Sequence, residues 1–294
     1  MLTPEQHYNK NPLHAYESEE HYEQAKRLAT SLYRYDQLPE RRIATIDAVT
    51  DDDVKRFWSE GYVVIDRLIG LELIEAAKQA LSDIIAGAVQ GPRIQFVGKR
   101  RDDWTAEEKE LSARVVTNYV AYEPRLQAIS HHPDIERLVA RLFGETGRMI
   151  ADQALLKPPG GGAEKPWHQD MAYGNFAYDK SVFGIWIALD PAELDNGCMH
   201  IIPYSHRDGG VPHYAVRDWQ ICDTSVRVER DVAVPLPPGG ALLFSSLLHH
   251  GTPPNFTPKR RRALQIHYAP ESAVKLTPQE YKRIFTNEMT NAEC

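Results

Sequence analysis

Residues 149–171 read MIADQALLKPPGGGAEKPWHQDM, in which a Pro-Gly turn separates two short runs that favour β-strand. Short apolar runs separated by turn residues continue toward the C-terminus, with further turn signals at Asn196-Gly197 and at residues 237–240, PPGG. No helix long enough for a parallel crossover interrupts it, so we predict an antiparallel sandwich or barrel of the jelly-roll type. The candidate strands are Met149–Leu156, Pro166–Met171, Val182–Leu189, Cys198–Ile202, Val232–Leu236, Ala241–Phe244 and Ala263–Tyr268.

Upstream of this β region, apolar residues recur at helical spacing. Helices are predicted over Asp51–Glu60, over residues 74–85 and over Pro133–Phe143, with a short strand at Tyr62–Ile65. We find no internal repeat and no clear linker. The chain therefore reads as mainly β with flanking helices, in which residues 1–49 form an N-terminal helical extension and residues 50–294 form a single domain.

Composition narrows the class of protein. The chain has 294 residues and a net charge of −7, which disfavours nucleic acid and anionic membranes as partners. It lacks an apolar run of about 18 residues that could span a membrane, and its polar N-terminus does not resemble a secretory signal. Three scattered cysteines are too few for a disulfide framework. We expect a cytoplasmic protein in a reducing compartment.

The most informative residues are His168 and Asp170. In a strand, alternate side chains share a face, so this imidazole and this carboxylate should project to the same side. A catalytic metal needs at least a third ligand, which His250 offers 82 residues later. Two histidines and one carboxylate that leave adjacent positions open are typical of non-haem Fe(II) oxygenases.

The neighbourhood of these residues resembles the phytanoyl-CoA dioxygenase family, whose members are Fe(II)- and 2-oxoglutarate-dependent oxygenases. The resemblance extends from about residue 50 to residue 269 and includes the Gly61–Val64 opening. It implies a double-stranded β-helix, a cupin-like jelly roll. The other matching segments, in the family's order, are Lys157–Gly160, Trp167–Asp170, Asn196–Met199, Ile202–His206, His250–Thr252 and Asn255 with the arginines Arg260–Arg262.

The resemblance implies roles for individual residues. His168, Asp170 and His250 match the iron ligands, and His250 is preferred to His249 because it directly precedes Gly-Thr. Arg261 matches the arginine that pairs with the distal carboxylate of 2-oxoglutarate. A planar guanidinium can donate two parallel hydrogen bonds to such a group. Two alternatives stay open. Arg260 or Arg262 could bind this carboxylate instead, or all three arginines could form a basic run on the surface.

Four further residues are candidates for binding 2-oxoglutarate. The hydroxyl of Thr252 could reach its distal carboxylate, and Trp186 matches an aromatic residue of the co-substrate pocket. Asn118 and Gln153 could donate to the keto-acid end. For Trp186 a place in the apolar core is the competing interpretation, and a polar residue in a strand can simply satisfy the backbone.

We therefore expect an Fe(II)- and 2-oxoglutarate-dependent dioxygenase that uses O₂ to hydroxylate a C–H bond of a small-molecule metabolite, with succinate and CO₂ as products. Asp170 disfavours halogenation, because halogenating relatives carry a small residue there. Desaturation, cyclisation and epimerisation are variants of the same chemistry. A zinc hydrolase and a non-catalytic metal sensor or store are the competing classes. A monomer or homodimer is expected, and the residues do not identify the substrate.

Overall fold

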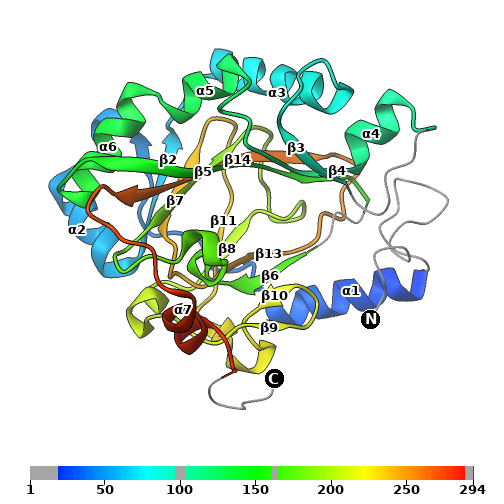
Figure 1. The fold of residues 1–294 in the computed structure, drawn as a ribbon. Helices are drawn as coiled ribbons and strands as arrows, with labels where there is room; N and C mark the ends of the chain where they lie inside the picture. The colour runs from blue at the N-terminus through cyan, green and yellow to red at the C-terminus, as the bar shows by residue number, and fades with distance from the viewer. Residues whose placement is uncertain (1–18, 97–102, 161–163, 289–293) are drawn as a thin grey trace.

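The computed structural model describes residues 19–96, 103–160, 164–288 and 294. Two β-sheets lie one above the other, and helices pack mainly against the larger sheet (Figure 1). The larger sheet has the strand order β1-β2-β12-β7-β14-β5-β4-β3, and the smaller has the order β11-β8-β13-β6. This is the predicted jelly roll with flanking helices.

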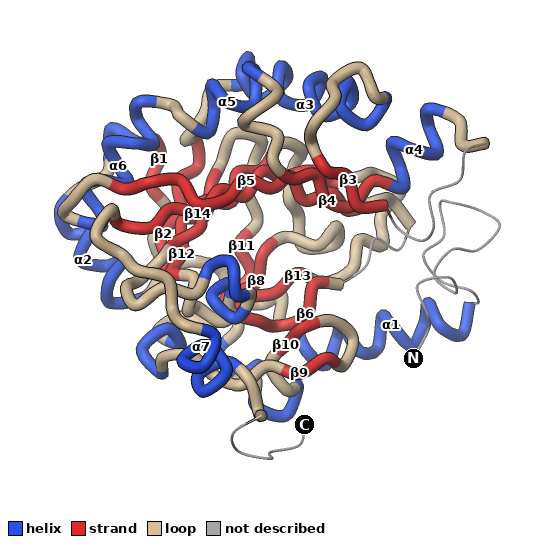
Figure 2. Tube along the Cα trace, viewed as in Figure 1, coloured by secondary structure: helices blue, strands red, loops and turns tan. Residues whose placement is uncertain are grey.

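Most strand pairs are antiparallel, as the short turns between them predict, and the tube in Figure 2 shows the two layers. The exception is β1, which pairs with β2 in parallel. A two-stranded ribbon of β9 and β10 adjoins the smaller sheet. The strands are β1 Ile43–Thr45, β2 Tyr62–Arg67, β3 Arg93–Phe96, β4 Ala113–Thr117, β5 Gly147–Lys157, β6 Lys165–His168, β7 Phe183–Ala188, β8 Met199–Ile201, β9 Tyr214–Ala215, β10 Trp219–Gln220, β11 Val232–Val234, β12 Ala241–Ser245, β13 His250–Thr252 and β14 Arg261–Pro270.

The helices cover the outer face of the larger sheet, except for α1 and α7, which lie beside the smaller one (Figure 1). Their apolar faces and the outward side chains of the sheet form one buried cluster, the helix-side core, which includes Leu81, Val116, Ala154 and Leu264. The helices are α1 Glu19–Leu32, α2 Asp51–Glu60, α3 Leu71–Ala86, α4 Ala106–Ser112, α5 Pro124–Ser130, α6 Pro133–Phe143 and α7 Pro278–Phe285.

A second buried cluster fills the space between the two sheets. This barrel core combines Trp186, Phe244 and Ala263 of the larger sheet with Met199 and Val234 of the smaller. Because side chains alternate along each strand, the larger sheet is covered on both faces. The functional side chains must therefore lie where polar residues interrupt the barrel core.

Helix α2 begins with a capping box that a basic residue reinforces. Thr50 Oγ1 accepts a hydrogen bond from the Asp53 amide at 3.2 Å, and Asp53 Oδ2 accepts one from the Thr50 amide at 3.0 Å. Arg41 Nε also donates to Asp53 Oδ1 at 3.0 Å. This bond to Arg41 lowers the pKa of Asp53 to about 2.

We predict that Asp53→Ala lowers the free energy of unfolding at pH 7 by about 1–2 kcal/mol, since it removes a helix cap and a charged partner. Because the folded-state pKa lies below the unfolded value, this stabilisation is present above about pH 4 and disappears as the pH falls toward 2. Denaturant unfolding at several pH values measures it. Asp52→Ala, which changes an exposed residue of the same turn, is the matched control. An equal loss in the two variants would contradict the cap assignment.

The structure corrects two details of the predicted elements. The strand expected over Pro166–Met171 ends at His168, and Asp170 begins the short 3₁₀ helix Asp170–Ala172. The pairing stops because the Gln169 amide donates to His213 Nε2 at 3.0 Å instead of to a neighbouring strand. In addition, β1 lies within the stretch assigned to the N-terminal extension and joins the larger sheet. Residues 1–18 of that extension lie outside the described residues.

The cysteine count did not lead us to expect a disulfide. Cys222 and Cys294 form a disulfide with a Cα–Cα distance of 5.3 Å, although 72 residues separate them, and Cys198 is buried and free. Only the fold brings these two residues together.

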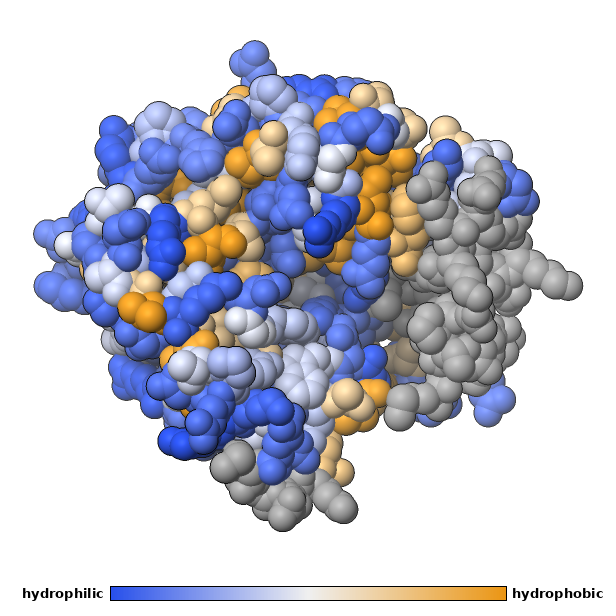
Figure 3. All heavy atoms as spheres, viewed as in Figure 1, coloured by the Kyte–Doolittle hydropathy of each residue, from blue (hydrophilic) through white to orange (hydrophobic). Residues whose placement is uncertain are grey.

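In the described part of the chain, no helix combines the length and apolarity needed to cross a membrane. The face seen in Figure 3 is largely hydrophilic, and its hydrophobic residues gather mainly in the upper half.

Candidate metal centre

His168 and His250 lie directly opposite each other in the smaller sheet. His168 ends β6, His250 begins β13, and the antiparallel register pairs the two residues. Their ring centroids are 4.1 Å apart. Gly251 permits this close pairing, because a Cβ there would lie 3.0 Å from the Tyr33 hydroxyl and 3.1 Å from the Lys165 carbonyl.

Both imidazoles are held in one tautomer. His168 Nδ1 contacts the Pro166 carbonyl at 2.8 Å, and His250 Nδ1 contacts the Leu248 carbonyl at 2.9 Å. A carbonyl only accepts, so each Nδ1 must carry the proton. Each Nε2 is left with a free lone pair, the state that a metal requires of a histidine ligand.

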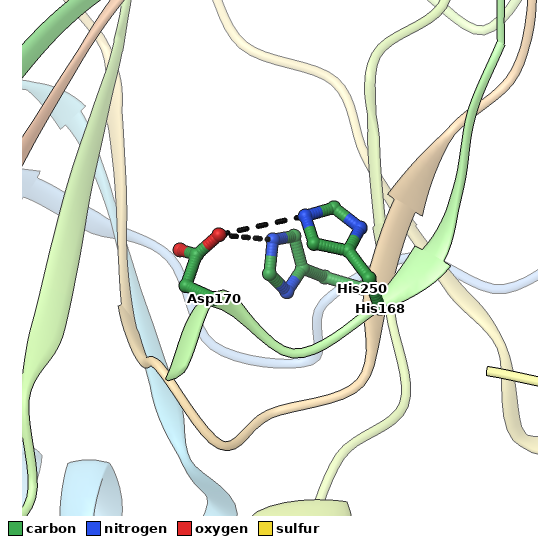
Figure 4. Close-up of side chains that lie close together, drawn as sticks. All are labelled: His168, Asp170 and His250. Carbon is green, nitrogen blue, oxygen red and sulfur yellow. Dashed lines mark ion pairs between the residues drawn. The ribbon is translucent and has the colours of Figure 1, made fainter. Parts of the chain in front are cut away.

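Asp170 faces both of these nitrogens (Figure 4). Although the strand has ended, Gln169 keeps an extended backbone (φ −114°, ψ 133°), so Asp170 still projects to the side of His168. Asp170 Oδ1 lies 3.4 Å from His168 Nε2 and 3.4 Å from His250 Nε2. All three side chains are buried.

This donor set fits a divalent metal ion. Two ligand atoms that are each about 2.1 Å from one ion can be at most about 4.2 Å apart, and both distances to Asp170 Oδ1 satisfy that limit. Burial, together with nearby His250, lowers the pKa of His168 to about 4. Burial would raise the pKa of Asp170, but His250 and His267 lower it well below its usual value. A neutral imidazole and an anionic carboxylate are what metal binding needs.

The second oxygen of Asp170 is held by two residues of β14 that the sequence analysis missed. Gln265 Nε2 donates to Asp170 Oδ2 at 2.9 Å, and His267 Nε2 lies 2.8 Å from the same oxygen. Phe176 stacks on the His267 ring at 4.2 Å. These contacts leave Oδ1 free to bind a metal. Strand alternation contained the signal, since Arg261, Gln265 and His267 share one face of a predicted strand.

We predict that His267→Ala weakens Fe(II) binding about 10- to 100-fold, the usual effect of removing a residue that orients a metal ligand. Calorimetric titration of the apo-protein with Fe(II) under anaerobic conditions measures this. His267→Gln, which keeps an N–H donor, should restore part of the affinity. Thermal unfolding of the apo-proteins separates this effect from a general loss of stability. Full affinity in His267→Ala would contradict the orienting role.

Arg261 lies on the same face of β14 as Gln265, four residues before it. It is only 2% exposed, and its Nε and Nη1 atoms are buried without a hydrogen-bond partner among the described residues. Burial lowers its pKa to about 10. Its neighbours differ, since Arg260 forms an ion pair with Glu110 and Arg262 forms one with Asp190. Alternation along the strand thus separates Arg261 from its two rivals.

Other cationic and aromatic groups surround Arg261. Its guanidinium carbon lies 5.0 Å from the ring centroid of Trp186, whose Nε1 is buried without a described partner. Lys157 pairs with Arg261 in the register of β5 and β14 and donates to the Thr252 carbonyl at 3.4 Å. Burial, followed by the charge of Arg261, lowers the pKa of Lys157 well below its usual value. Lys157 belongs to one of the sequence segments that match the family, but the sequence predicted no function for its side chain.

The remaining candidates are placed differently. Gln153 lies opposite Gln265 on the inner face of the larger sheet. Asn118 is exposed and adopts a left-handed backbone (φ 60°) just after β4. It contacts none of the three metal-site residues, and its donation to 2-oxoglutarate stays a prediction. His249 is buried, but it lies outside the group formed by His168, Asp170 and His250.

Known proteins are similar to this chain in structure or in sequence. The structure of EvdO2 from Micromonospora carbonacea var. aurantiaca, complexed with 2-oxoglutarate, superposes with a TM-score of 0.64 at 23% identity and covers 79% of this chain and 96% of that one. Phytanoyl-CoA dioxygenase domain-containing protein 1 of Danio rerio is 24% identical over 80% of this chain and 95% of its own. A probable alpha-ketoglutarate-dependent hypophosphite dioxygenase of Stutzerimonas stutzeri is 28% identical over 74% of this chain and 78% of its own.

The jelly roll and its two-histidine, one-carboxylate centre define a non-haem Fe(II)- and 2-oxoglutarate-dependent dioxygenase. The family model of phytanoyl-CoA dioxygenase (PhyH) matches residues 57–263, which is well over half of the chain. The chain belongs to this family.

Proposed function

We propose that the protein hydroxylates a C–H bond of a small-molecule metabolite and couples this to the conversion of 2-oxoglutarate and O₂ into succinate and CO₂. His168 Nε2, Asp170 Oδ1 and His250 Nε2 would hold the iron. When bound, the Fe(II) ion with 2-oxoglutarate and O₂ supplies the oxidising power that breaks the C–H bond.

The observation that carries the co-substrate assignment is the charge of Arg261, whose buried Nε and Nη1 atoms have no partner among the described residues. A buried guanidinium without an anionic partner costs free energy, and a carboxylate that accepts two parallel hydrogen bonds offsets this cost. The distal carboxylate of 2-oxoglutarate is such a partner. We propose that Arg261 binds it, with the Thr252 hydroxyl, Trp186 Nε1 and Lys157 Nζ as further donors.

The chain's own residues then have defined tasks. Gln265 and His267 hold Asp170 so that only one of its oxygens faces the metal. Trp186 and Phe244 pack beside the centre and exclude water from it, and the Phe244 ring lies 4.6 Å from that of His250. Exclusion of water and fixed orientation of both reactants protect the oxidant and direct it to one substrate atom.

Purified protein mixed with Fe(II), ascorbate and 2-oxoglutarate tests the proposal. We expect slow succinate formation in the absence of a primary substrate and faster formation when a substrate is added. Incorporation of one atom of ¹⁸O from O₂ into the product would identify hydroxylation. Stable 2-oxoglutarate under all conditions would overturn the proposal in favour of a zinc hydrolase or a metal sensor.

A further inference from the structure

A row of polar residues runs across the larger sheet from the metal centre to the sheet edge. The strand registers pair Gln265 of β14 with Gln153 of β5, Gln153 with Thr117 of β4, and Thr117 with Arg93 of β3. Residues paired in this way point to the same face of a sheet. Gln265 points to the metal centre, since it donates to Asp170. We call Gln153, Thr117 and Arg93 the polar row.

Burial independently confirms that the polar row faces the inside of the jelly roll. Ile94 in β3, Val116 in β4 and Ala154 in β5, which are sequence neighbours of the row, pack into or against the helix-side core. Leu155, two residues beyond Gln153, packs against the barrel core instead. In Figure 1, β3, β4 and β5 lie above β6 and β13, which carry the two histidines.

The side chains of the polar row are not used to stabilise the fold. Gln153, Thr117 and Arg93 make no side-chain hydrogen bond or ion pair with any residue of the described ranges. Arg93 is exposed, whereas Gln153 and Thr117 are half-buried. The inward-facing positions of β3, β4 and β5 carry no carboxylate in the described chain, because Asp152 faces the helices and accepts from the Val120 amide at 2.8 Å.

We propose that the polar row binds the primary substrate and that this substrate is a small organic anion. The inference rests on the proposed function and adds the substrate class. Arg93 pairs with a carboxylate or phosphate group of the substrate, and Gln153 and Thr117 bind polar groups along its length. Neighbouring strands are about 4.8 Å apart, so three strand spacings from β14 to β3 place the anionic group about 14 Å across the sheet from Gln265.

Basic residues on the inner face of the larger sheet would favour the binding of anions there, although the protein as a whole is acidic. The chain has a net charge of −7, yet Lys157, Arg261 and Arg93 all face inward from strands β5, β14 and β3 of one sheet. Arg261 and Lys157 lie where 2-oxoglutarate is proposed to bind, and Arg114 of β4 donates to the Glu164 carbonyl at 3.3 Å, which leaves Arg93 for the substrate. Charged residues on edge strands also prevent sheets from pairing edge to edge. That role alone predicts no effect of Arg93 on substrate affinity.

Three matched probes test the substrate class. N-octanoylglycine carries a carboxylate, N-octanoyl-O-phosphoethanolamine carries a phosphate, and N-octanoylglycinamide is neutral. Each is titrated calorimetrically into the Mn(II)- and 2-oxoglutarate-loaded protein without O₂, and each is tested for faster succinate formation in the Fe(II) enzyme. We expect at least one anion to bind at least tenfold more tightly than the amide. The tighter anion identifies the acidic group. Equal affinity for all three, or no binding of either anion, would overturn the proposal.

Substitutions assign the preference to the row. Arg93→Gln should raise the Kd of the preferred anion at least tenfold and leave that of the amide unchanged, so that the preference disappears. Thr117→Val should weaken all three probes, since they share the amide group. Arg67→Gln is the control, because Arg67 is an exposed arginine at the end of β2, near the opposite edge of the same sheet. An anion preference that survives in Arg93→Gln would contradict the assignment.

The experiments distinguish a failure of the proposed function from a failure of the substrate class. A protein that forms no succinate from 2-oxoglutarate lacks the proposed function, whatever binds to the polar row. A protein that forms succinate but binds anion and amide equally keeps the proposed function and loses only the substrate class.

Discussion

His168→Ala should abolish 2-oxoglutarate turnover and reduce Fe(II) affinity more than about 100-fold. Removal of a residue that merely orients a metal ligand weakens metal binding about 10- to 100-fold, and His168 is itself proposed as one of three ligands. The variant leaves His250 and Asp170, which occupy two positions and no longer define one face of the ion. Anaerobic Fe(II) titration and succinate formation without substrate measure the two effects.

The neighbouring histidine provides the control. His249 is buried next to His250, but it lies outside the group of three ligand atoms. His249→Ala should therefore keep Fe(II) binding and turnover, provided that thermal unfolding shows a folded protein. Persistent succinate formation in His168→Ala, or an equal loss in both variants, would contradict the ligand assignment.

Arg261→Ala should raise the Kd of 2-oxoglutarate about 100-fold and leave Fe(II) affinity nearly intact. Loss of a buried charged partner typically costs about 2–5 kcal/mol, and each 1.4 kcal/mol corresponds to a factor of ten. Without Arg261 the distal carboxylate loses two donors, whereas the three metal ligands keep all their contacts. Titration of 2-oxoglutarate into the Mn(II)-loaded protein separates the two affinities.

The same residue should have the opposite effect on the protein without its co-substrate. Arg261→Met keeps most of the side-chain volume and removes a buried charge that has no described anionic partner. We expect its unfolding temperature without 2-oxoglutarate to equal or exceed that of the parent. Added 2-oxoglutarate should stabilise the parent but not the variant, because only a bound ligand shifts the unfolding equilibrium.

Arg260→Ala is the matched control for Arg261, since its guanidinium faces Glu110 on the other side of the strand. It should leave 2-oxoglutarate affinity within a few-fold of the parent. Similar losses in Arg260→Ala and Arg261→Ala would instead indicate a diffuse basic patch.

The regular elements were predictable where local signals agree. Helix α2 begins and ends as predicted because three acidic residues follow its N-cap and Gly61, with φ 91°, ends it. Strands such as β7 and β12 were recognised as continuous apolar runs, since both of their faces are buried. Elements with weak local signals were missed. Strand β3 has a single alternating pattern over four residues, and β13 is only three residues long.

The cluster of three candidate metal ligands was predictable because two of them are close in sequence and the third precedes a recognisable Gly-Thr pair. The residues around them were not. Gln265 and His267 contact Asp170 across 95 and 97 residues of chain. No local pattern encodes that contact, which depends on β14 lying opposite the 3₁₀ turn after β6.

The amino-acid sequence by itself determined the strand and turn pattern, the family and the identity of the three candidate metal ligands, because these depend on residue type and short-range spacing. The tertiary structure alone decided that Arg261, rather than Arg260 or Arg262, is the buried arginine. It also decided that Cys222 meets Cys294 and that Gln153, Thr117 and Arg93 form one row. The reason is physical: strand register and the packing of two sheets fix which distant side chains share a face, and neither is written in any short stretch of chain.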